Sequence, residues 1–85
     1  MYLHLGKGAV IRQSEIVGIF DLDITSQSHL TRKYLSIADK AGRVVNAAED
    51  LPKSFVVCAS GRENTVILSQ MSCATLLKRN ESELL

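Results

Sequence analysis

Positively charged side chains recur along one stretch of the sequence at the spacing of a helix face. The set falls at i, i+4, i+7, i+11 and i+14, with one arginine beside it: His29, Lys33, Ser36, Lys40, Arg43 and Arg32. Residues at such steps share one side of an α-helix, and only Asp39 interrupts the positive run. Ammonium and guanidinium groups along one face can follow a nucleic-acid backbone and release its counterions. We therefore predict a phosphate-contacting ridge, although an ordinary solvated helix face would carry the same residue types.

Two further cations stand outside this run. Lys53 follows the rigid Pro52 at the start of an apolar segment, and Arg12 ends an extended segment near the N-terminus. Either could add a positioned charge to a phosphate-binding surface. The predicted DNA-contacting set is therefore Arg32, Lys33, Lys53, Lys40, Arg43 and Arg12.

The residues that could support catalysis or metal binding form no recognisable motif. Cys58 and Cys73 show neither a CxxC pattern nor a Cys/His zinc spacing, and His4 and His29 are the available imidazoles. We predict that both cysteines are reduced thiols in the core. We also predict that the protein is not an enzyme and has no catalytic residue, no metal site and no cofactor.

Two short motifs have simpler structural interpretations than functional ones. The Gly6–Gly8 segment lacks the lysine and hydroxyl pattern of a P-loop and does not precede a helix, so it indicates a hairpin turn. Asp21 and Asp23 lie two residues apart, where a metal site is conceivable. Solvated carboxylates or turn caps explain that pair better.

Length and composition predict one small domain that needs a partner surface. A domain of 85 residues buries only roughly 60–65% of the surface exposed by its unfolded chain, and this core must be aliphatic because the sequence has no Trp. Net charge is +1, from ten Lys and Arg against nine Asp and Glu, which is far from global basicity. We expect residues 1–85 to form a single domain that is not stable as a monomer. No leader or membrane-spanning run is evident, so we expect a cytoplasmic protein without a membrane partner.

The elements that must position these residues alternate between strand and helix patterns. Extended patterns predict strands at residues 2–5, 9–12, 16–20, 43–47, 54–59 and 65–69, with the two-sided apolar segment 16–20 as an interior strand. The last two of these strands are predicted to form an antiparallel hairpin. Ser72 should cap a short C-terminal helix that runs through Arg79.

The main helix is predicted from a change of period at Leu30. Its proposed apolar stripe consists of Leu30, Tyr34, Ile37, Ala38 and Ala41. Ser26 or Ser28 could cap its start and Gly42 could close its end. The order β-β-β-α-β-β-β-α predicts an α+β fold with a small, mainly antiparallel sheet, one main helix and a short C-terminal helix.

Four segments, in this order and spacing, resemble the RemB-type members of the extracellular matrix regulator family (RemA/RemB). They span nearly the whole chain: residues 2–6 (YLHLG), 16–21 (IVGIFD), 52–57 (PKSFVV) and 72–79 (SCATLLKR). RemA-type relatives are similar to small DNA-binding activators of biofilm-matrix genes that assemble into rings and wrap DNA around outer arginines. The resemblance implies a bacterial transcription regulator that forms a ring-like homo-oligomer.

The resemblance carries over only in part to individual positions. Where RemA-type relatives have basic residues, this chain has Glu15 in one segment and Glu49 and Asp50 in another, so that Lys53 alone keeps the charge. The helix cations Arg32 and Lys33 match basic positions of the family better. Two functions stay open: an oligomeric DNA-associated regulator, and a non-catalytic interaction or assembly module that acts through a partner such as a RemA-type relative.

Overall fold

The computed structural model describes residues 2–22 and 28–84 of the chain. Among these residues the elements follow in the order β1 (Tyr2–Gly6), β2 (Ala9–Arg12), η1 (Gln13–Glu15), β3 (Ile16–Asp21), α2 (His29–Lys40), β4 (Val44–Asn46), β5 (Ser54–Ser60), β6 (Glu63–Ser69) and α3 (Cys73–Leu84). The predicted α+β class and the mainly antiparallel pairing are confirmed. The short 3-10 turn η1 has no counterpart in the prediction.

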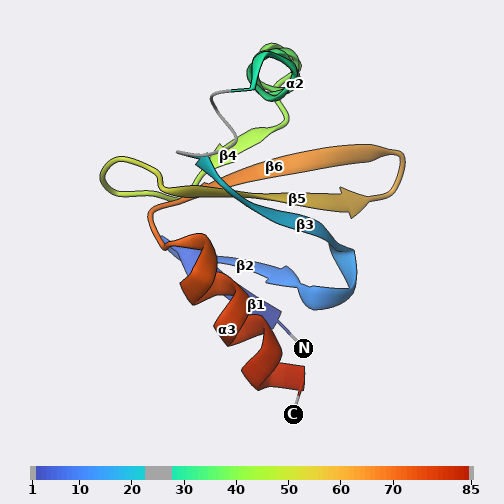
Figure 1. Cartoon of the computed structure of the whole chain (residues 1–85). Helices are drawn as coiled ribbons and strands as arrows, with labels where there is room; N and C mark the ends of the chain where they lie inside the picture. Colours follow the sequence, from blue (N-terminus) through green and yellow to red (C-terminus); the bar gives the residue numbers. More distant parts are fainter. Residues whose placement is uncertain (1, 23–27, 85) are drawn as a thin grey trace.

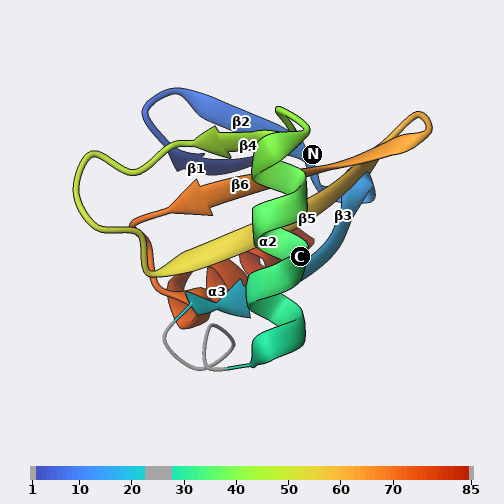
Figure 2. The same ribbon diagram turned by 90° about the horizontal axis from the view of Figure 1, so that it is seen from above.

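The described strands are divided between two sheets in a layered arrangement (Figure 1). The larger sheet has the strand order β3-β5-β6-β4, and β1 pairs with β2 in a separate two-stranded sheet. Helix α2 covers one face of the larger sheet, while the β1–β2 hairpin and α3 lie against the other face (Figures 1 and 2). Each face of the larger sheet therefore has its own hydrophobic cluster.

Strand β5 is one of the two interior strands of the larger sheet, with β6 as the other. It pairs antiparallel with both β3 and β6, and its side chains alternate between the two clusters. Phe55 and Val57 pack beneath α2, whereas Val56 and Cys58 pack toward the hairpin and α3. Because both faces are covered, β5 is apolar along most of its length.

The prediction that segment 16–20 is an interior strand is wrong, because β3 lies at an edge of the sheet. Ile16 and Ile19 pack against the hairpin-side cluster, while the side chain of Val17 is 62% exposed. One apolar face of β3 thus packs on the hairpin-side cluster, whereas the other is largely exposed beside α2, where Phe20 stacks on Phe55 with ring centroids 5.0 Å apart; the two-sided pattern reflects these two different surroundings. It does not require a neighbouring strand on each side.

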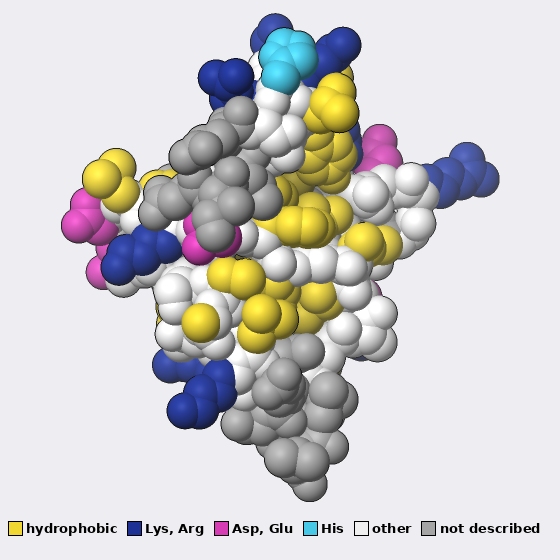
Figure 3. Space-filling model, in the orientation of Figure 1, with side chains coloured by type: hydrophobic (Ala, Val, Ile, Leu, Met, Phe, Trp, Pro, Cys, Tyr) yellow, Lys and Arg dark blue, Asp and Glu magenta, His cyan; other side chains and the backbone are white. Residues whose placement is uncertain are grey.

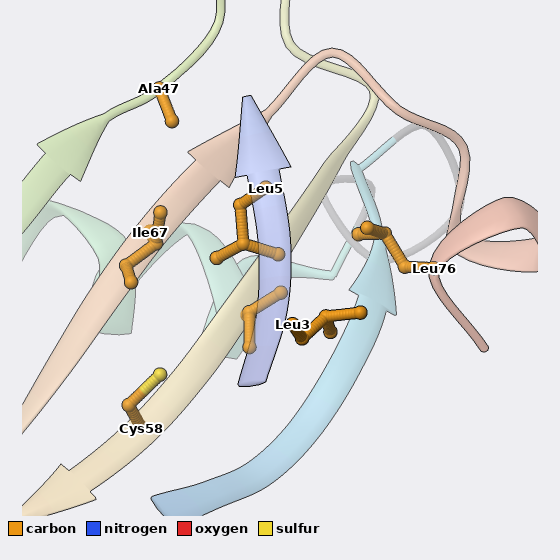
Figure 4. Close-up of a cluster of buried hydrophobic side chains, with 7 residues drawn as sticks. Leu3, Leu5, Ala47, Cys58, Ile67 and Leu76 are labelled. Atoms are coloured by element: carbon orange, nitrogen blue, oxygen red, sulfur yellow. The ribbon is translucent and has the colours of Figure 1, made fainter. Parts of the chain in front are cut away.

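The hairpin-side cluster joins residues that are distant in the sequence (Figure 4). Leu3 and Leu5 from β1 and Leu76 from α3 are fully buried among side chains of β5 and β6. Two buried serines secure the strand ends nearby. Ser69 Oγ donates a hydrogen bond of 2.7 Å to the Leu5 carbonyl, and Ser54 Oγ donates one of 2.7 Å to the Met71 carbonyl.

The predicted turns and hairpins are confirmed. Lys7 (φ 46°) and Gly8 (φ 74°) form the two-residue turn between β1 and β2, and Gly61 (φ 69°) lies in the turn between β5 and β6. The positive φ values at both positions of the first turn match the twist that a two-residue hairpin requires. Ser72 Oγ accepts a hydrogen bond from the Thr75 N–H, as predicted for a cap.

Two boundaries differ from the prediction. Helix α3 continues past Arg79 to Leu84, and β4 comprises three residues and pairs parallel with β6. The parallel pairing arises because β5 reverses the chain between these two strands.

Candidate nucleic-acid interface

Helix α2 has well-defined ends that fix the faces it presents. Ser28 Oγ accepts a hydrogen bond from the Thr31 N–H at 3.5 Å, which confirms one of the two predicted caps, and Ser26 lies outside the described residues. At the other end, Gly42 has φ 72° and its N–H donates to the Asp39 carbonyl, while the Arg43 N–H donates to the Ala38 carbonyl. This pattern is typical of a glycine-terminated helix, as predicted.

The inward face of α2 differs from the predicted stripe. Ala38 is fully buried, and Tyr34 and Leu35 pack partly buried against the same cluster. Leu30 and Ile37, predicted as core residues, are 75% and 52% exposed, and Ala41 is exposed as well. The stripe prediction is wrong at these positions because α2 is oriented so that Ala38 faces the sheet.

The outward face of α2 carries the predicted ridge. Its described side chains are exposed to solvent: His29, Arg32, Lys33, Ser36 and Lys40. The cations Arg32, Lys33 and Lys40 spread over about 12 Å of helix length, and exposed Asp39 lies beside them. Figure 3 shows the dark blue and cyan side chains gathered around α2 at the top of the molecule. Sequence spacing therefore identified a group of cations that the fold brings together.

Arg43 is separated from this ridge by the turn that ends α2. It is half-buried, and its Nη1 donates a 2.9 Å hydrogen bond to the carbonyl of Asn64 at the start of β6. The guanidinium thus holds the turn before β4 against the β5–β6 hairpin. Its position fits a structural contact better than a free phosphate-binding group.

Lys53 and Arg12 lie elsewhere on the molecule. The Lys53 N–H donates to the Ser69 carbonyl and its own carbonyl accepts from the Leu22 N–H, so its backbone is held while its side chain is exposed. Arg12 is exposed at the end of β2, in the layer on the opposite side of the larger sheet from α2. The structure does not bring the six predicted cations into one patch on a single subunit.

The acidic residues that replace basic residues of the relatives lie in the β4–β5 loop and in η1. Glu49 and Asp50 are exposed in the loop between β4 and β5, where their backbone N–H groups donate to Oε1 of Gln70 at 2.9 and 3.3 Å. Glu15 is half-buried in η1. This acidic loop and the α2 ridge give the surface both signs of charge.

The two cysteines differ in their surroundings. Cys58 is buried as predicted, whereas Cys73 is half-buried and its Sγ donates to the Ile19 carbonyl at 3.7 Å. Desolvation by burial, and secondarily the charge of Glu15, raise the pKa of the Cys58 thiol above its ordinary value of 9.0. Asp23 of the Asp21/Asp23 pair lies outside the described residues. Within residues 2–22 and 28–84, no group of three His, Cys, Asp or Glu side chains could hold a metal ion.

We expect iodoacetamide to modify Cys58 in the folded protein more slowly than Cys73, because burial keeps the first thiol neutral and covered. The neutral thiol of Cys58 makes its full contribution to the free energy of unfolding below pH 9.0, and this contribution is lost as the pH rises through the raised pKa. Mass spectrometry of timed samples, with a urea-unfolded control, measures both rates. Equal rates in the folded protein would contradict the assignment.

Within the described residues, no helix combines the length and hydropathy needed to cross a membrane. The family model for extracellular matrix regulatory protein A-like proteins (RemA-like) matches residues 2–79. The chain belongs to the RemA-like family. It is also similar to extracellular matrix regulatory protein B of Bacillus subtilis (strain 168), with 34% identity over 79 residues that cover 93% of this chain and 89% of the relative. In this RemA-like chain, the matched region includes every element from β1 to the first half of α3.

Proposed function

We propose that this protein is an oligomeric bacterial transcription regulator that associates with DNA in the cytoplasm and controls extracellular-matrix genes of biofilms. Membership of the RemA-like family and the name of the Bacillus subtilis relative support the matrix-regulator role. The observation that carries DNA association is the exposed ridge of α2, in which Arg32, Lys33 and Lys40 face away from the sheet. No cofactor or catalytic step is part of this function.

The mode of binding follows from the charge of one subunit. A net charge of +1 and one short ridge give a single copy little affinity for a polyanion. A ring-like homo-oligomer repeats the ridge, so that several weak backbone contacts act on the same DNA molecule. Such binding is insensitive to base sequence and strongly dependent on salt, because it depends on counterion release.

We expect the triple variant Arg32→Ala/Lys33→Ala/Lys53→Ala to bind long duplex DNA more weakly than the wild type. Its affinity should also fall less steeply with salt, by roughly 0.9 in the log–log slope for each phosphate that the variant no longer neutralises. Fluorescence anisotropy at several salt concentrations, with light scattering on the same samples, measures affinity and assembly together. The exposed changes should alter stability by no more than about 0.5 kcal/mol per site.

A charge-matched control is available on the opposite layer. Lys7, Lys78 and Arg79 are exposed in the β1–β2 turn and on α3, so their replacement by alanine removes the same charges away from α2. The control variant should keep more of the affinity than the variant that lacks Arg32, Lys33 and Lys53. Equal losses of DNA affinity in the two variants would contradict the proposed binding site. If the intact wild-type oligomer does not bind DNA at low salt, direct DNA association is rejected.

A second candidate function is a non-catalytic interaction or assembly module that does not contact DNA directly. The exposed acidic pair Glu49 and Asp50 and the near-neutral net charge favour this alternative. The partner would then be another protein, with a RemA-type relative as one candidate. Co-purification with that relative, together with absent DNA binding by the protein alone, would support it.

A further inference from the structure

The β1–β2 hairpin has a solvent-exposed face that points away from the core. Its inward side chains are Leu3 and Leu5, which are fully buried, and Ala9 and Ile11, which pack against the same cluster. Successive side chains of a strand point to opposite faces, so the alternate positions point outward. The side chains of this outward face are all exposed: Tyr2, His4, Val10 and Arg12. The hairpin lies on the opposite side of the larger sheet from α2, so its outward face is separate from the α2 ridge (Figure 1).

The strand register groups these four side chains into two cross-strand pairs. Tyr2 lies opposite Arg12, and His4 lies opposite Val10. Side chains that lie directly opposite on one face have Cβ atoms about 4.5–5.5 Å apart. Tyr2 and His4 are two residues apart on β1, which separates their Cα atoms by about 7 Å. The hairpin therefore places two ring side chains in a row, with a guanidinium group beside the first.

Tyr2 supplies an exposed aromatic ring to the outward face. Its exposed fraction is 52%, whereas that of Phe55 in the core is 3%. An exposed ring on an open sheet can stack on a flat partner without rearrangement of the core. The bases of a single nucleic-acid strand are such partners, because they are unpaired and every base has a π-face. Histidine rings stack on unpaired bases in the same way.

The charges around the outward face favour an anionic partner. Neither β1 nor β2 contains an acidic residue, and exposed Lys7 adds a second cation at the turn between them. Glu15 follows Arg12 closely in the sequence, but its charge raises the pKa of the Cys58 thiol, which belongs to the hairpin-side cluster. The Glu15 carboxylate therefore acts toward the core. A phosphate group can approach Arg12 and Lys7 without meeting a carboxylate of the hairpin.

We propose that the outward face of the β1–β2 hairpin binds single-stranded DNA. Unpaired bases stack on Tyr2 and His4, and the Arg12 guanidinium contacts a backbone phosphate. Duplex DNA cannot use the two rings in this way, because its bases are paired and stacked on one another. The choice of DNA over RNA rests on the proposed function, which places the protein on DNA. With both surfaces, the chain can hold a duplex at α2 and an unpaired strand at the hairpin.

Tyrosine fluorescence provides a direct test, because the sequence has no Trp and only two Tyr. Tyr34→Phe leaves Tyr2 as the single tyrosine. The Tyr34 hydroxyl is buried without a hydrogen-bond partner among the described residues, so its removal should cost little stability. We expect oligothymidylate to quench the fluorescence of this variant, because a base stacks on Tyr2. Tyr2→Phe, in which only Tyr34 is fluorescent, is the control and should keep most of its signal.

Variants at Tyr2 separate stacking from ordinary apolar contact. Tyr2→Leu keeps an apolar side chain but has no ring, whereas Tyr2→Phe keeps the ring. We expect Tyr2→Leu to bind labelled oligothymidylate at least about fivefold more weakly than the wild type, which corresponds to the lower limit of stacking on one base. Tyr2→Phe should retain most of the affinity. Fluorescence anisotropy measures each affinity, and circular dichroism verifies that the variants fold.

A variant at Arg12 tests the phosphate contact. Arg12→Ala should reduce the salt dependence of oligothymidylate binding by about 0.7 in the log–log slope, as expected for one phosphate of a single strand. Arg62→Ala is the matched control, because it removes the same charge at an exposed position in the turn between β5 and β6. The slope of the control should equal that of the wild type. Equal decreases of the slope in the two variants would remove Arg12 from the site.

Three results would overturn the inference. They are unquenched Tyr2 fluorescence with oligothymidylate at low salt; equal affinities of the wild type and Tyr2→Leu; and equal quenching of Tyr2 by poly-glutamate, which would mean that the face attracts any polyanion. The variant that lacks Arg32, Lys33 and Lys53 should still show quenching of Tyr2. If duplex DNA does not bind but oligothymidylate quenches Tyr2, the proposed duplex association is rejected while the single-strand site stands. The reverse outcome rejects this site alone.

Discussion

Replacing Leu76 with alanine is expected to lower the free energy of unfolding by about 2–5 kcal/mol, the largest change that we predict for a single side chain. Leu76 is fully buried in the hairpin-side cluster, where it joins α3 to Leu3 and Leu5 of β1 and to the larger sheet. Its removal leaves a cavity between layers that are connected largely by side-chain packing. A small domain has only about 5–15 kcal/mol of stability in total, so this decrease is a large fraction of it.

Equilibrium unfolding in urea measures this effect, with the slope of the transition as a check on two-state behaviour. Leu77→Ala is the matched control, because the same change is made one residue further along α3 at a 44% exposed side chain. We expect the control to lose much less stability. Comparable decreases for Leu76 and Leu77 would mean that α3 does not pack as the structure places it. Because the proposed assembly would also stabilise folded subunits, the two variants should be compared at one protein concentration.

Local features of the fold could be predicted from the sequence because neighbouring residues determine them. The Gly6–Gly8 turn, the Ser72 cap and the glycine after α2 are short-range signals, and each appears in the structure. The hairpin of β5 and β6 is also local, since Gly61 permits its tight turn. Such signals depend on backbone conformation and hydrogen bonds within a few residues.

The arrangement of the elements could not be predicted in the same way. Strand β3 has a two-sided apolar pattern, yet only β5 pairs with it among the described strands, and Val17 on one of its faces is 62% exposed. The inward direction of α2 was misjudged for a related reason. Leu30 and Ala38 belong to one plausible stripe, but the structure buries the small residue and exposes the large one. A sequence pattern alone does not show how closely a helix approaches its sheet.

In the candidate site, too, some features could be predicted from the sequence and others could not. The ridge of Arg32, Lys33 and Lys40 could be predicted because helix periodicity alone places these residues on one face. Arg43 could not, because its contact with Asn64 joins residues that are 21 positions apart. The open apolar groove beside α2, which is lined by Val17, Phe20 and Leu30 among others, was not predicted, because it forms between a strand and a helix that are separated in the sequence.

The glycine that ends β1, next to the first turn, gives the second large predicted effect. We expect Gly6→Ala to destabilise the protein by roughly 1–3 kcal/mol through its backbone conformation, with a further steric penalty. Gly6 has φ 114°, a value that is unfavourable for residues with a Cβ atom, and a Cβ there would lie 2.9 Å from the Ala47 carbonyl oxygen. Backbone atoms cannot move aside as a flexible side chain can. The strain would act next to Leu5, whose carbonyl accepts from buried Ser69.

Gly8→Ala is the matched control for Gly6→Ala. Gly8 has φ 74° in the turn that follows β1, but a Cβ there would meet no described atom within 4 Å. The control therefore carries only the cost of a left-handed conformation, about 1–2 kcal/mol, without a backbone clash. Urea unfolding of both variants compares these costs. Should Gly8→Ala be the more damaging change, the close approach of Gly6 to the end of β4 could not be correct. A larger decrease in the free energy of unfolding for Gly6→Ala would instead show that this glycine is needed for the β1–β2 hairpin to pack against the larger sheet, on the face opposite α2 and its proposed DNA ridge.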